Sequence, residues 1–339
     1  MLKGLKNKLI KLLELIGVTL LCLIVTLLGV IWVLEKGPSP TMTATFTRSV
    51  RETSALKFIS KIFLSEEELE RYKSVSTEET MTESVDTALI DISGAEINSS
   101  EPDMQLIDIS AGTCKGKLLI VKDPKRVILG TSENFYYEPG LLVTDMVKKY
   151  GGIAGTNAGG FHDDGGQGDG GSPDGLVICD GKLLAGNGSL TYNIVGLNND
   201  GILIVNTMSG NDALAQGVKY GVSFTTFDGV ASALIINGEI QKQNLGGGVN
   251  PRTAIGQRAD GAILLLVLDG RSISTLGASL QNVAEIMLEY GAVNAGNLDG
   301  GSSSVMVYED EIINNCASVT GPRRVPTGFI VLKEGDSVG

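Results

Sequence analysis

The sequence has 339 residues, and its 39 acidic side chains outnumber its 27 basic ones, giving a formal net charge of -12. This length suits one sizeable domain with additional segments, because single hydrophobic cores rarely grow beyond about 250–300 residues. The acidic balance argues against a nucleic-acid partner, since phosphate backbones select basic faces. A hydrophobic fraction of 42% excludes a globally disordered chain.

The first recognisable element is an apolar run from Ile16 to Leu34 that contains no charged side chain. As a helix it would span about 28 Å, close to the hydrocarbon thickness of a bilayer. Lysines precede the run, and their excess predicts a cytoplasmic N-terminus with the rest of the chain outside the cell. We therefore predict an uncleaved single-pass anchor within residues 1–36. A cleaved signal peptide is the alternative, but its apolar core is usually only ~7–15 residues long.

The next segment, residues 37–105, has the pattern of a stalk. Apolar residues recur at helical spacing between Phe46 and Phe63. Ser65 and Glu68 have the form of a capping box, which predicts a second short helix beginning there. The stretch from residue 74 to residue 103 is rich in Ser, Thr and Glu, and this composition predicts a linker.

A different pattern begins near residue 106, where short β-rich runs are each bounded by Gly, Asn or Asp. Turn dipeptides such as Asn237-Gly238 separate them, as expected between hairpin strands. Leu141–Tyr150 and Ser279–Tyr290 have helical periodicity instead. Residues 106–335 are therefore predicted to form an α+β domain with few helices and a mixed, largely antiparallel sheet. The expected strands are Lys117–Val121, Arg126–Leu129, Leu176–Cys179, Ile202–Val205, Leu234–Ile236 and Ile263–Leu268.

Four cysteines are spread through the chain without any CxxC pair. Cys22 falls in the apolar run, which leaves Cys114, Cys179 and Cys316, an odd number. This pattern implies neither a complete disulfide framework nor a zinc site. One bridge among the three and three buried thiols are both compatible with it.

Three loops rich in Gly, Asp and Asn follow strand-like runs, and a shorter polar piece lies near the C-terminus. They cover Thr156–Gly166, Asn250–Gly256, Asn294–Ser304 and Arg323–Thr327. Loops at strand ends are where sheet proteins commonly gather the polar residues of a site. We therefore looked for the chemistry of the chain in these loops.

Several loop residues have both a functional and a purely structural interpretation. Asp299, followed by two glycines, could face the oxygens of a ligand or cap its own turn. Arg252 could hold a phosphate as a fork or form a salt bridge at the surface. His162, the only histidine of the chain, could assist at the site or be incidental.

Taken in chain order, these loops resemble the successive signatures of the phosphodiester glycosidase family, over about residues 106–333. The matching pieces are Asn157–Phe161, Gly175–Gly181, Arg252–Gly256, Asn297–Ser303 and Arg323–Thr327. The resemblance implies a hydrolase that splits a sugar from the phosphate on its anomeric carbon. It also implies a carbohydrate phosphodiester as substrate, in cell-envelope or exopolysaccharide metabolism outside the membrane.

The implied chemistry suits a chain with a single histidine. The leaving group is a phosphate monoester with a second pKa near ~6, so a strong general acid is less necessary than for a sugar alkoxide. The reaction needs a carboxylate that activates water or traps the oxocarbenium ion, and cations or amides that hold the phosphate. No cofactor is expected, although a structural or catalytic divalent cation is left open.

The resemblance also suggests a role for each candidate residue. The catalytic candidates are Asp299 as the carboxylate, Asp269 as a second or positioning carboxylate, and His162 as an assisting group. Arg252 and Arg323 are candidate clamps for the phosphate or the sugar. The remaining candidates for substrate binding are Asn157, Gly159, Gly160, Phe161, Gly300, Gly301, Ser302 and Thr327.

Two other functions fit parts of the sequence. Asp163, Asp164, Asp169 and Asp174 could ligate a hard cation in a phosphodiesterase that breaks a P–O bond, although no EF-hand spacing supports this. The anchor and the stalk would suit a non-enzymatic surface module that binds anionic glycopolymers equally well. The products separate these functions, because the glycosidase releases free sugar, the phosphodiesterase releases sugar phosphate, and the binding module releases neither.

Overall fold

The computed structural model describes most of the chain. The described residues are 2–52, 54–72, 84–93, 102–163, 168–224, 232–242, 245–270, 275, 277–318 and 321–334. Most of the predicted Ser/Thr/Glu-rich linker lies outside these ranges, as does Asp164.

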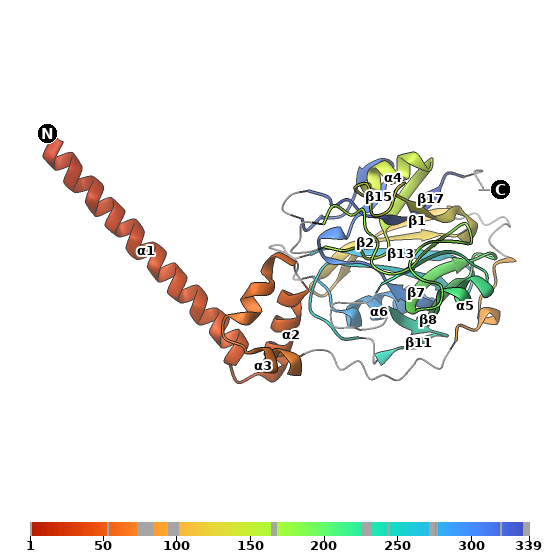
Figure 1. Ribbon diagram of the computed structural model, residues 1–339, viewed down its shortest axis with the longest axis horizontal. Coiled ribbons are helices and arrows are strands. Elements are labelled where there is room, and N and C mark those ends of the chain that lie inside the picture. The colour runs from red at the N-terminus through yellow and green to blue at the C-terminus, as the bar shows by residue number, and fades with distance from the viewer. Residues whose placement is uncertain are drawn as a thin grey trace.

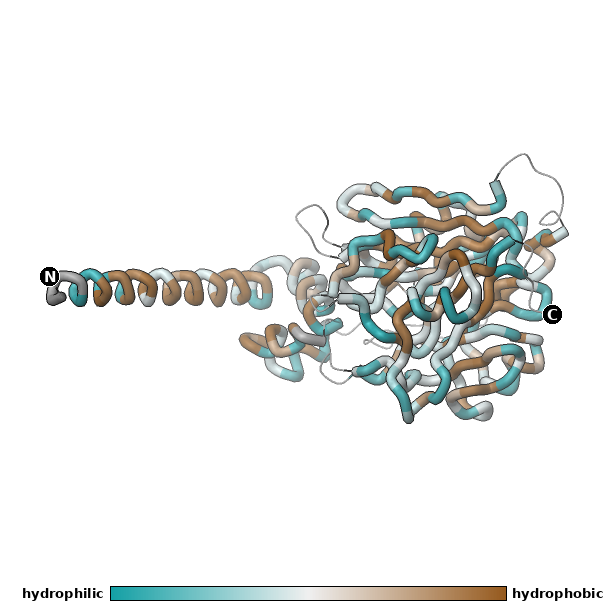
Figure 2. The backbone as a smooth tube through the Cα atoms, turned by 90° about the horizontal axis from the view of Figure 1, so that it is seen from above, coloured by the Kyte–Doolittle hydropathy of each residue, from teal (hydrophilic) through white to brown (hydrophobic). Residues whose placement is uncertain are grey.

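The chain opens with a long helix, α1 (Leu2–Lys36), which projects away from the body of the molecule (Figure 1). Large apolar side chains are exposed along most of its length, and Figure 2 shows the same stretch as hydrophobic. Among the described residues it is the one helix long and apolar enough to cross a membrane, with a window of mean hydropathy 2.7 within Lys6–Lys36. A signal sequence near the N-terminus would meet the same criterion of length and composition.

Three short helices connect α1 to the body: α2 (Pro40–Arg51), the 3-10 helix η1 (Ser54–Lys61) and α3 (Glu66–Arg71). The predicted capping box opens α3, where the Glu68 main-chain amide donates to the Ser65 hydroxyl and the Ser65 amide donates to the Glu68 carboxylate. The Phe63 amide donates to the Glu35 carboxylate at 3.1 Å, which ties the end of α1 to this group. The predicted helical stretch between Phe46 and Phe63 is therefore divided between α2 and η1.

The body consists of three antiparallel sheets. The seven-stranded sheet has the order β1 (Met104–Ala111), β2 (Cys114–Val121), β13 (Ile263–Leu268), β12 (Arg252–Arg258), β14 (Ala292–Asn297), β10 (Ala233–Ile236) and β11 (Glu239–Ile240). The second sheet has the order β16 (Glu311–Ile312), β15 (Met306–Tyr308), β4 (Gly152–Asn157), β17 (Thr327–Leu332) and β3 (Val127–Thr131). The third has the order β6 (Lys182–Ala185), β5 (Val177–Cys179), β9 (Val218–Ser223), β7 (Thr191–Asn198) and β8 (Leu203–Ser209).

Few helices accompany these strands, so the α+β prediction is confirmed. They are α4 (Val143–Lys149), α5 (Gly210–Ala215), α6 (Leu280–Glu289) and three short 3-10 helices, η2 (Thr87–Leu89), η4 (Pro124–Arg126) and η7 (Gly301–Ser303). Each of the six predicted strand segments overlaps an observed strand. Both predicted helices are also present, as α4 and α6. The structure further shows that the strands divide among three sheets, which the sequence pattern did not reveal.

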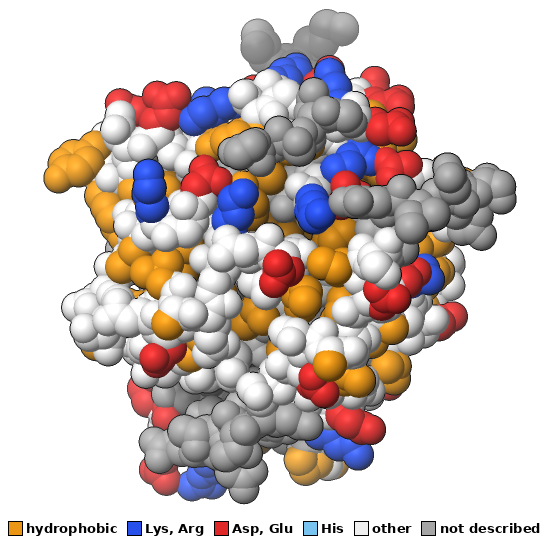
Figure 3. Space-filling model, turned by 90° about the vertical axis from the view of Figure 1, so that its right-hand side faces the viewer, with side chains coloured by type: hydrophobic (Ala, Val, Ile, Leu, Met, Phe, Trp, Pro, Cys, Tyr) orange, Lys and Arg blue, Asp and Glu red, His pale blue; other side chains and the backbone are white. Residues whose placement is uncertain are grey.

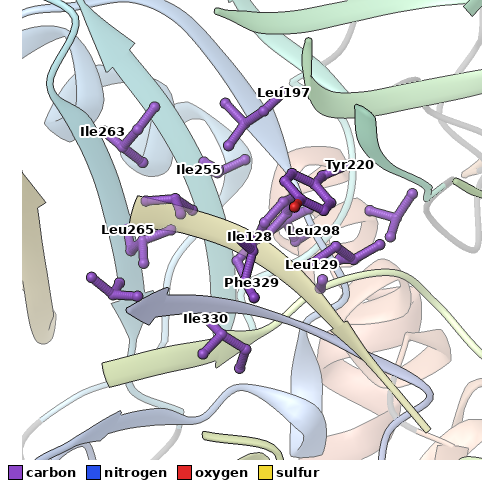
Figure 4. Packing of buried hydrophobic residues seen from close by; sticks show 14 of the residues in the cluster. Ile128, Leu129, Leu197, Tyr220, Ile255, Ile263, Leu265, Leu298, Phe329 and Ile330 are labelled. Carbon is purple, nitrogen blue, oxygen red and sulfur yellow. The ribbon is translucent and has the colours of Figure 1, made fainter. Parts of the chain in front are cut away.

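The largest apolar core lies where the three sheets meet (Figure 4). Leu265 comes from the seven-stranded sheet, Phe329 from the second sheet and Leu197 from the third, and all three are buried in one cluster. Leu298 belongs to the same cluster and is fully buried. Because Leu298 immediately precedes Asp299, the core fixes the start of the loop in which Asp299 lies.

The helix α6 covers the other face of the seven-stranded sheet. Its side chains Leu280, Val283 and Met287 are fully buried in a second apolar cluster with Leu264 and Leu266 of β13. This arrangement explains why β13 is apolar at every position: one face of the strand meets the first core and the other meets α6. Such two-sided burial produces a continuous apolar run.

The four cysteines are all unbridged in the structure. Of the two alternatives predicted for Cys114, Cys179 and Cys316, the structure therefore shows separate thiols. Burial raises the pKa of the Cys179 thiol to about 11, and its sulfur contacts the Leu129 carbonyl oxygen at 3.4 Å. A thiol with so high a pKa is almost entirely protonated near neutral pH and is a poor nucleophile.

The surface carries charges of both signs. On the face shown in Figure 3, acidic and basic side chains are scattered among neutral ones rather than separated into two fields. Side chains of one sign therefore do not form a continuous patch on this face.

Candidate active site

Asp299 lies where the three predicted glycine-rich loops meet. It follows β14, and its main-chain amide donates to the Ala158 carbonyl oxygen in the first loop at 2.9 Å. Its own carbonyl oxygen accepts a hydrogen bond from the Asn157 side-chain amide at 2.6 Å. Two residues later, the Gly301 amide donates to the Pro251 carbonyl oxygen of the second loop at 2.9 Å. The main chain around Asp299 is therefore held from two sides.

The carboxyl group of Asp299 has an unusual acidity. The side chain retains some exposed surface, but burial by surrounding protein atoms raises its pKa from the ordinary 3.8 to about 7. A hydrogen bond from the Ser303 side chain and the positive charge of Arg323 oppose this rise, whereas the negative charge of Asp163 adds to it. Near neutral pH the group is therefore divided between its ionised and protonated forms.

Arg323 provides the positive charge beside Asp299. Its guanidinium donates to both carboxylate oxygens of Asp163, at 2.9 and 3.1 Å. It also donates to the Ser302 hydroxyl at 3.2 Å and to the Gly168 carbonyl oxygen at 2.9 Å. Arg323 was predicted as a clamp for the phosphate or the sugar, and in this structure its guanidinium is paired with both carboxylate oxygens of Asp163. Arg323 therefore acts on Asp299 through its charge, and Asp163 holds it in place.

The ring of Phe161 packs against the guanidinium of Arg323. The guanidinium carbon of Arg323 lies 5.2 Å from the centre of the Phe161 ring, within the range of a cation–π interaction. Phe161 is half-buried and pairs with Pro173 in an isolated β-bridge. The structure thus places Phe161 and Ser302 around one cation, although each was predicted only from its own loop.

Asn157 was predicted to line the sugar pocket, but the structure buries it completely. Its side-chain oxygen accepts from the Thr253 hydroxyl at 2.9 Å and from the Val305 amide at 3.2 Å, while its nitrogen donates to Asp299. These bonds engage both polar atoms of the amide. Asn157 is therefore a positioning residue that joins the first and second loops to Asp299.

Gly159, Gly160 and Thr327 were likewise expected to contact the substrate, and all three are buried. The Gly159 amide donates to the Thr327 hydroxyl oxygen at 3.0 Å. A Cβ atom at Gly159 would lie 3.0 Å from the Val222 side chain, so the absence of a side chain allows this close packing. In this structure these three residues pack in the interior and support the first loop, while the Gly300–Ser302 segment keeps some exposed surface beside Asp299.

Arg252, the second predicted clamp, is paired with a carboxylate from the N-terminal helices. Its guanidinium donates to Glu52 at 2.8 Å, and only 5% of the Arg252 side chain and 8% of the Glu52 side chain are exposed. Further bonds run to the carbonyl oxygens of Gly248 at 2.6 Å and Ala278 at 3.2 Å. Of the two interpretations of Arg252, the structure shows an ion pair, and that pair is buried rather than at the surface.

The remaining catalytic candidates lie in different surroundings. Asp269 follows β13, where its amide donates to the Lys115 carbonyl oxygen at 2.7 Å and its carboxylate accepts from the Asn315 amide at 2.9 Å. Burial raises its pKa above the ordinary value. The contacts described for Asp269 are therefore with Lys115 and Asn315 rather than with Asp299. His162 has an exposed side chain, and its main-chain amide donates to Ser172.

The acidic residues considered for a metal site are dispersed in the structure. Asp163 binds Arg323, and Asp169 accepts from the Gly171 amide at 2.9 Å. Asp174 lies in a separate turn beside a cavity. Among the described residues, no three His, Cys, Asp or Glu side chains are grouped so that they could hold a metal ion. Asp164 lies outside the described part of the chain.

Three residues with clear structural roles were absent from the predicted site. Asp163 was noted only as a metal ligand, although its position directly after His162 in the first loop placed it near Phe161. Ser303 lies in the predicted third loop and donates to Asp299. Glu52 lies about 200 residues before its partner Arg252, in the predicted stalk. No local sequence signal could have indicated that long-range contact.

The part of the chain that contains these loops is similar to known proteins. A family model described as phosphodiester glycosidase matches residues 150–332, just over half of the chain. N-acetylglucosamine-1-phosphodiester alpha-N-acetylglucosaminidase from Mus musculus is 29% identical over 150 residues, which cover 39% of this chain and 28% of the mouse protein. A prophage-derived uncharacterized protein of Bacillus subtilis (strain 168) is 42% identical over 66 residues, 20% of this chain and 10% of that protein.

A solved structure shares the fold. The catalytic domain of zebrafish N-acetylglucosamine-1-phosphodiester alpha-N-acetylglucosaminidase superposes with a TM-score of 0.57 at 22% sequence identity, covering 70% of this chain and 86% of the zebrafish chain. By contrast, this chain spans less than a third of the length of the curated relatives that it matches.

Proposed function

This chain belongs to the phosphodiester glycosidase family, and on that premise we propose that it hydrolyses the bond between a sugar and the phosphate on its anomeric carbon. The observation that carries the proposal is Asp299, a carboxyl with a pKa raised to about 7, held in a fixed loop beside the cation Arg323. A carboxyl with a pKa near the working pH is well suited to proton transfer or to nucleophilic attack.

Asp299 is proposed to act in its ionised form. It either takes a proton from the water that attacks the anomeric carbon or traps the developing oxocarbenium ion directly. Its main chain is fixed by the Ala158 carbonyl oxygen and the Asn157 side chain, so the carboxylate is positioned before substrate arrives. As the carbon–oxygen bond breaks, the phosphate monoester leaves with the bonding electrons. Where the carboxylate has trapped the sugar as an ester, water then hydrolyses that ester, which releases the free sugar and restores the carboxylate.

The departing phosphate carries negative charge, which Arg323 is proposed to stabilise. Phe161 and Asp163 fix the guanidinium, so its charge is aligned before the reaction and need not reorganise during it. The partly exposed Ser302 lies at this position and can donate a further hydrogen bond to the phosphate. Because the leaving group is a phosphate monoester, its departure does not need a strong general acid. We propose that no cofactor is required.

We further propose that α1 anchors the enzyme in a membrane and that the catalytic body works outside the cytoplasm. The support is the apolar length of α1 and the lysines that precede its apolar run. A substrate in the cell envelope or an exopolysaccharide, with sugar-1-phosphate linkages, would be accessible from that side.

The test uses the full chain in mild detergent and N-acetylglucosamine 1-phosphate esterified to a simple alcohol, the linkage in the names of the relatives. Mass spectrometry identifies the released species. We expect free N-acetylglucosamine and a phosphomonoester, with turnover at least about a hundredfold lower in Asp299→Asn. Asp310→Asn is the matched control, because this exposed turn residue has a φ of 69°, which Asn tolerates. Release of sugar 1-phosphate, or unchanged turnover in Asp299→Asn, would contradict the proposal.

A further inference from the structure

Glu52 lies at the C-terminal end of α2, where the N-terminal helices meet the body. Its main-chain amide donates to the Arg48 carbonyl oxygen at 3.0 Å, which completes the last turn of the helix. The dipole of a helix disfavours a carboxylate at this end, because the last carbonyl oxygens carry partial negative charge. The helix itself therefore does not account for an acidic residue here, and its partners in the body do.

The carboxylate of Glu52 is bound by one loop of the body. One oxygen accepts from the Gly248 amide at 2.9 Å, and the other accepts from the Asn250 side-chain amide and from the Arg252 guanidinium, the latter at 2.8 Å. Only 8% of the Glu52 side chain is exposed. Hydrogen bonds to an ionised group are short and strong, so this buried carboxylate holds its three donors in fixed directions.

The loop is shaped to receive α2. A Cβ atom at Gly248 would lie 2.2 Å from the main-chain nitrogen of Ser49, and one at Gly247 would lie 2.5 Å from a carboxylate oxygen of Glu52. Gly247 also has a φ of +92°, a conformation that favours glycine. A side chain at either position would push α2 away from the loop. The close fit therefore depends on this placement of α2.

The residues on either side of Arg252 hold the proposed catalytic loop. Pro251 precedes the arginine, and its carbonyl oxygen accepts from the Gly301 amide at 2.9 Å. Thr253 follows the arginine, and its carbonyl oxygen accepts from the Leu298 amide at 2.9 Å. These two bonds lie on either side of the proposed catalytic carboxylate in the sequence. The arginine that Glu52 binds is therefore placed between the two supports of that loop.

The catalytic loop also packs directly against this segment. A Cβ atom at Gly300 would lie 2.8 Å from the Pro251 carbonyl oxygen and 3.8 Å from the Cδ atom of Arg252. A shift of the arginine would therefore be transmitted to the loop by direct contact. In an enzyme, a displacement of about 1 Å at the reacting groups can lower the rate by about a hundredfold.

We propose that Glu52 is a positioning residue for the hydrolysis at Asp299. It fixes Arg252, and the segment around Arg252 holds the main chain of the Asp299 loop. Glu52 acts through these contacts and does not touch the substrate. The inference rests on the proposed function and adds to it a requirement for the N-terminal helices, which are then part of the working enzyme as well as its connection to α1.

The test compares Glu52→Ala with the wild type, as the full chain in mild detergent, on N-acetylglucosamine 1-phosphate esterified to methanol. Assays are made at a temperature where circular dichroism shows the variant to be folded. We expect kcat to fall at least about tenfold, because the segment behind the Asp299 loop is no longer fixed. Acetate supplies the atoms that alanine lacks relative to glutamate. Sodium acetate should therefore restore kcat at least about threefold, compared with sodium chloride at the same ionic strength.

Hydrogen exchange reports on the same loop without any substrate. In Glu52→Ala, the amides of Leu298 and Gly301 should exchange at least about tenfold faster than in the wild type, and acetate should slow them again. The amides of β7 and β8 in the third sheet should exchange at the wild-type rate. Faster exchange in all of these strands, without recovery of kcat in acetate, would show that Glu52 serves stability alone and would overturn the proposal.

Glu67→Ala is the matched control, because Glu67 belongs to the same group of helices, is 83% exposed and pairs with Arg71. Its kcat should equal that of the wild type. Ser49→Ala is a milder change at the contact, since it removes the acceptor of the Val249 amide, and it should lower kcat about two- to threefold.

Unchanged kcat and unchanged exchange in Glu52→Ala would rule out the positioning role. A higher kcat would also overturn it, because Glu52 would then restrain the enzyme instead of supporting it. A wild-type protein that does not cleave the diester would contradict the proposed function, and the exchange of Leu298 and Gly301 would still decide whether Glu52 positions the loop.

Discussion

Replacing Asp299 with Asn should make the protein more stable at alkaline pH while it removes activity. Folding raises the pKa of Asp299 from 3.8 to about 7. A carboxyl whose pKa is raised by folding binds its proton more tightly in the native state. Its contribution to stability is therefore fully present below about pH 4 and is lost as the pH rises through about 7. Asparagine does not titrate, so the variant escapes this loss.

The magnitude follows from the size of the shift. A rise from 3.8 to about 7 is about three pKa units, and each unit corresponds to about 1.4 kcal/mol, so the upper limit is about 4 kcal/mol. Solvent reaches part of the Asp299 side chain and screens the interaction. We therefore expect the free energy of unfolding of the variant to gain about 1–3 kcal/mol over the wild type between about pH 5 and about pH 8.

Equilibrium unfolding in urea, with the full chain in detergent at several pH values, measures this difference. Asp310→Asn serves again as the control, and its stability should follow that of the wild type at every pH. The decisive quantity is the difference between Asp299→Asn and the wild type as a function of pH. A difference that stays constant, or that grows toward acid pH, would refute the assignment of a raised pKa to Asp299.

Three further outcomes are expected from the same contacts. The kcat/KM of the wild type should rise with pH through about 7. Arg323→Met should move this inflection upward by about one pH unit, because the cation lowers the pKa of Asp299. An inflection that does not move would contradict this effect of Arg323 on Asp299. Glu52→Gln should lower the free energy of unfolding by about 2–4 kcal/mol, because it leaves the buried Arg252 charge without its carboxylate. Urea unfolding measures this change, and an unchanged free energy of unfolding would contradict the role of the ion pair. Asn157→Ala should reduce turnover at least about tenfold and the free energy of unfolding by about 1–3 kcal/mol, since three hydrogen bonds around the Asp299 loop are lost. Full activity in kinetic assays would contradict the role of Asn157 in positioning Asp299.

Some elements of the fold could be predicted because their sequence expresses their burial directly. The strand β13 is apolar throughout, and it was predicted at its observed bounds, Ile263–Leu268. By contrast, β4 and β14 consist largely of glycine, alanine and asparagine, which have low strand propensity. Neighbouring side chains explain this composition: a Cβ atom at Gly296 in β14 would lie 2.7 Å from Val195. Tertiary packing selected small residues there and removed the usual strand signal.

In the candidate site, too, some residues could be predicted from the sequence and the roles of others could not. The loop motifs indicated Asp299, Arg323 and Phe161, because functional loops are rich in recognisable residue types. What the motifs could not indicate is which polar atoms are already engaged by the protein. Asn157 was assigned to the sugar from its motif, yet its bonds to Asp299, Thr253 and Val305 turn it inward. Such assignments depend on side-chain direction, which spacing along the chain does not encode.

Hydrogen bonds join the N-terminal helices to the body of the molecule. The Val249 amide donates to the Ser49 hydroxyl at 2.8 Å, and the Gly248 amide donates to Glu52 at 2.9 Å, so α2 is fastened to the body. Only residues 37–39 separate α2 from α1. With α1 as the proposed anchor, a short connection rather than a long flexible linker would therefore join the body to the membrane. Under the proposed membrane anchorage, the fold would set the height of the body above the bilayer, and a polymeric substrate would have to reach that height.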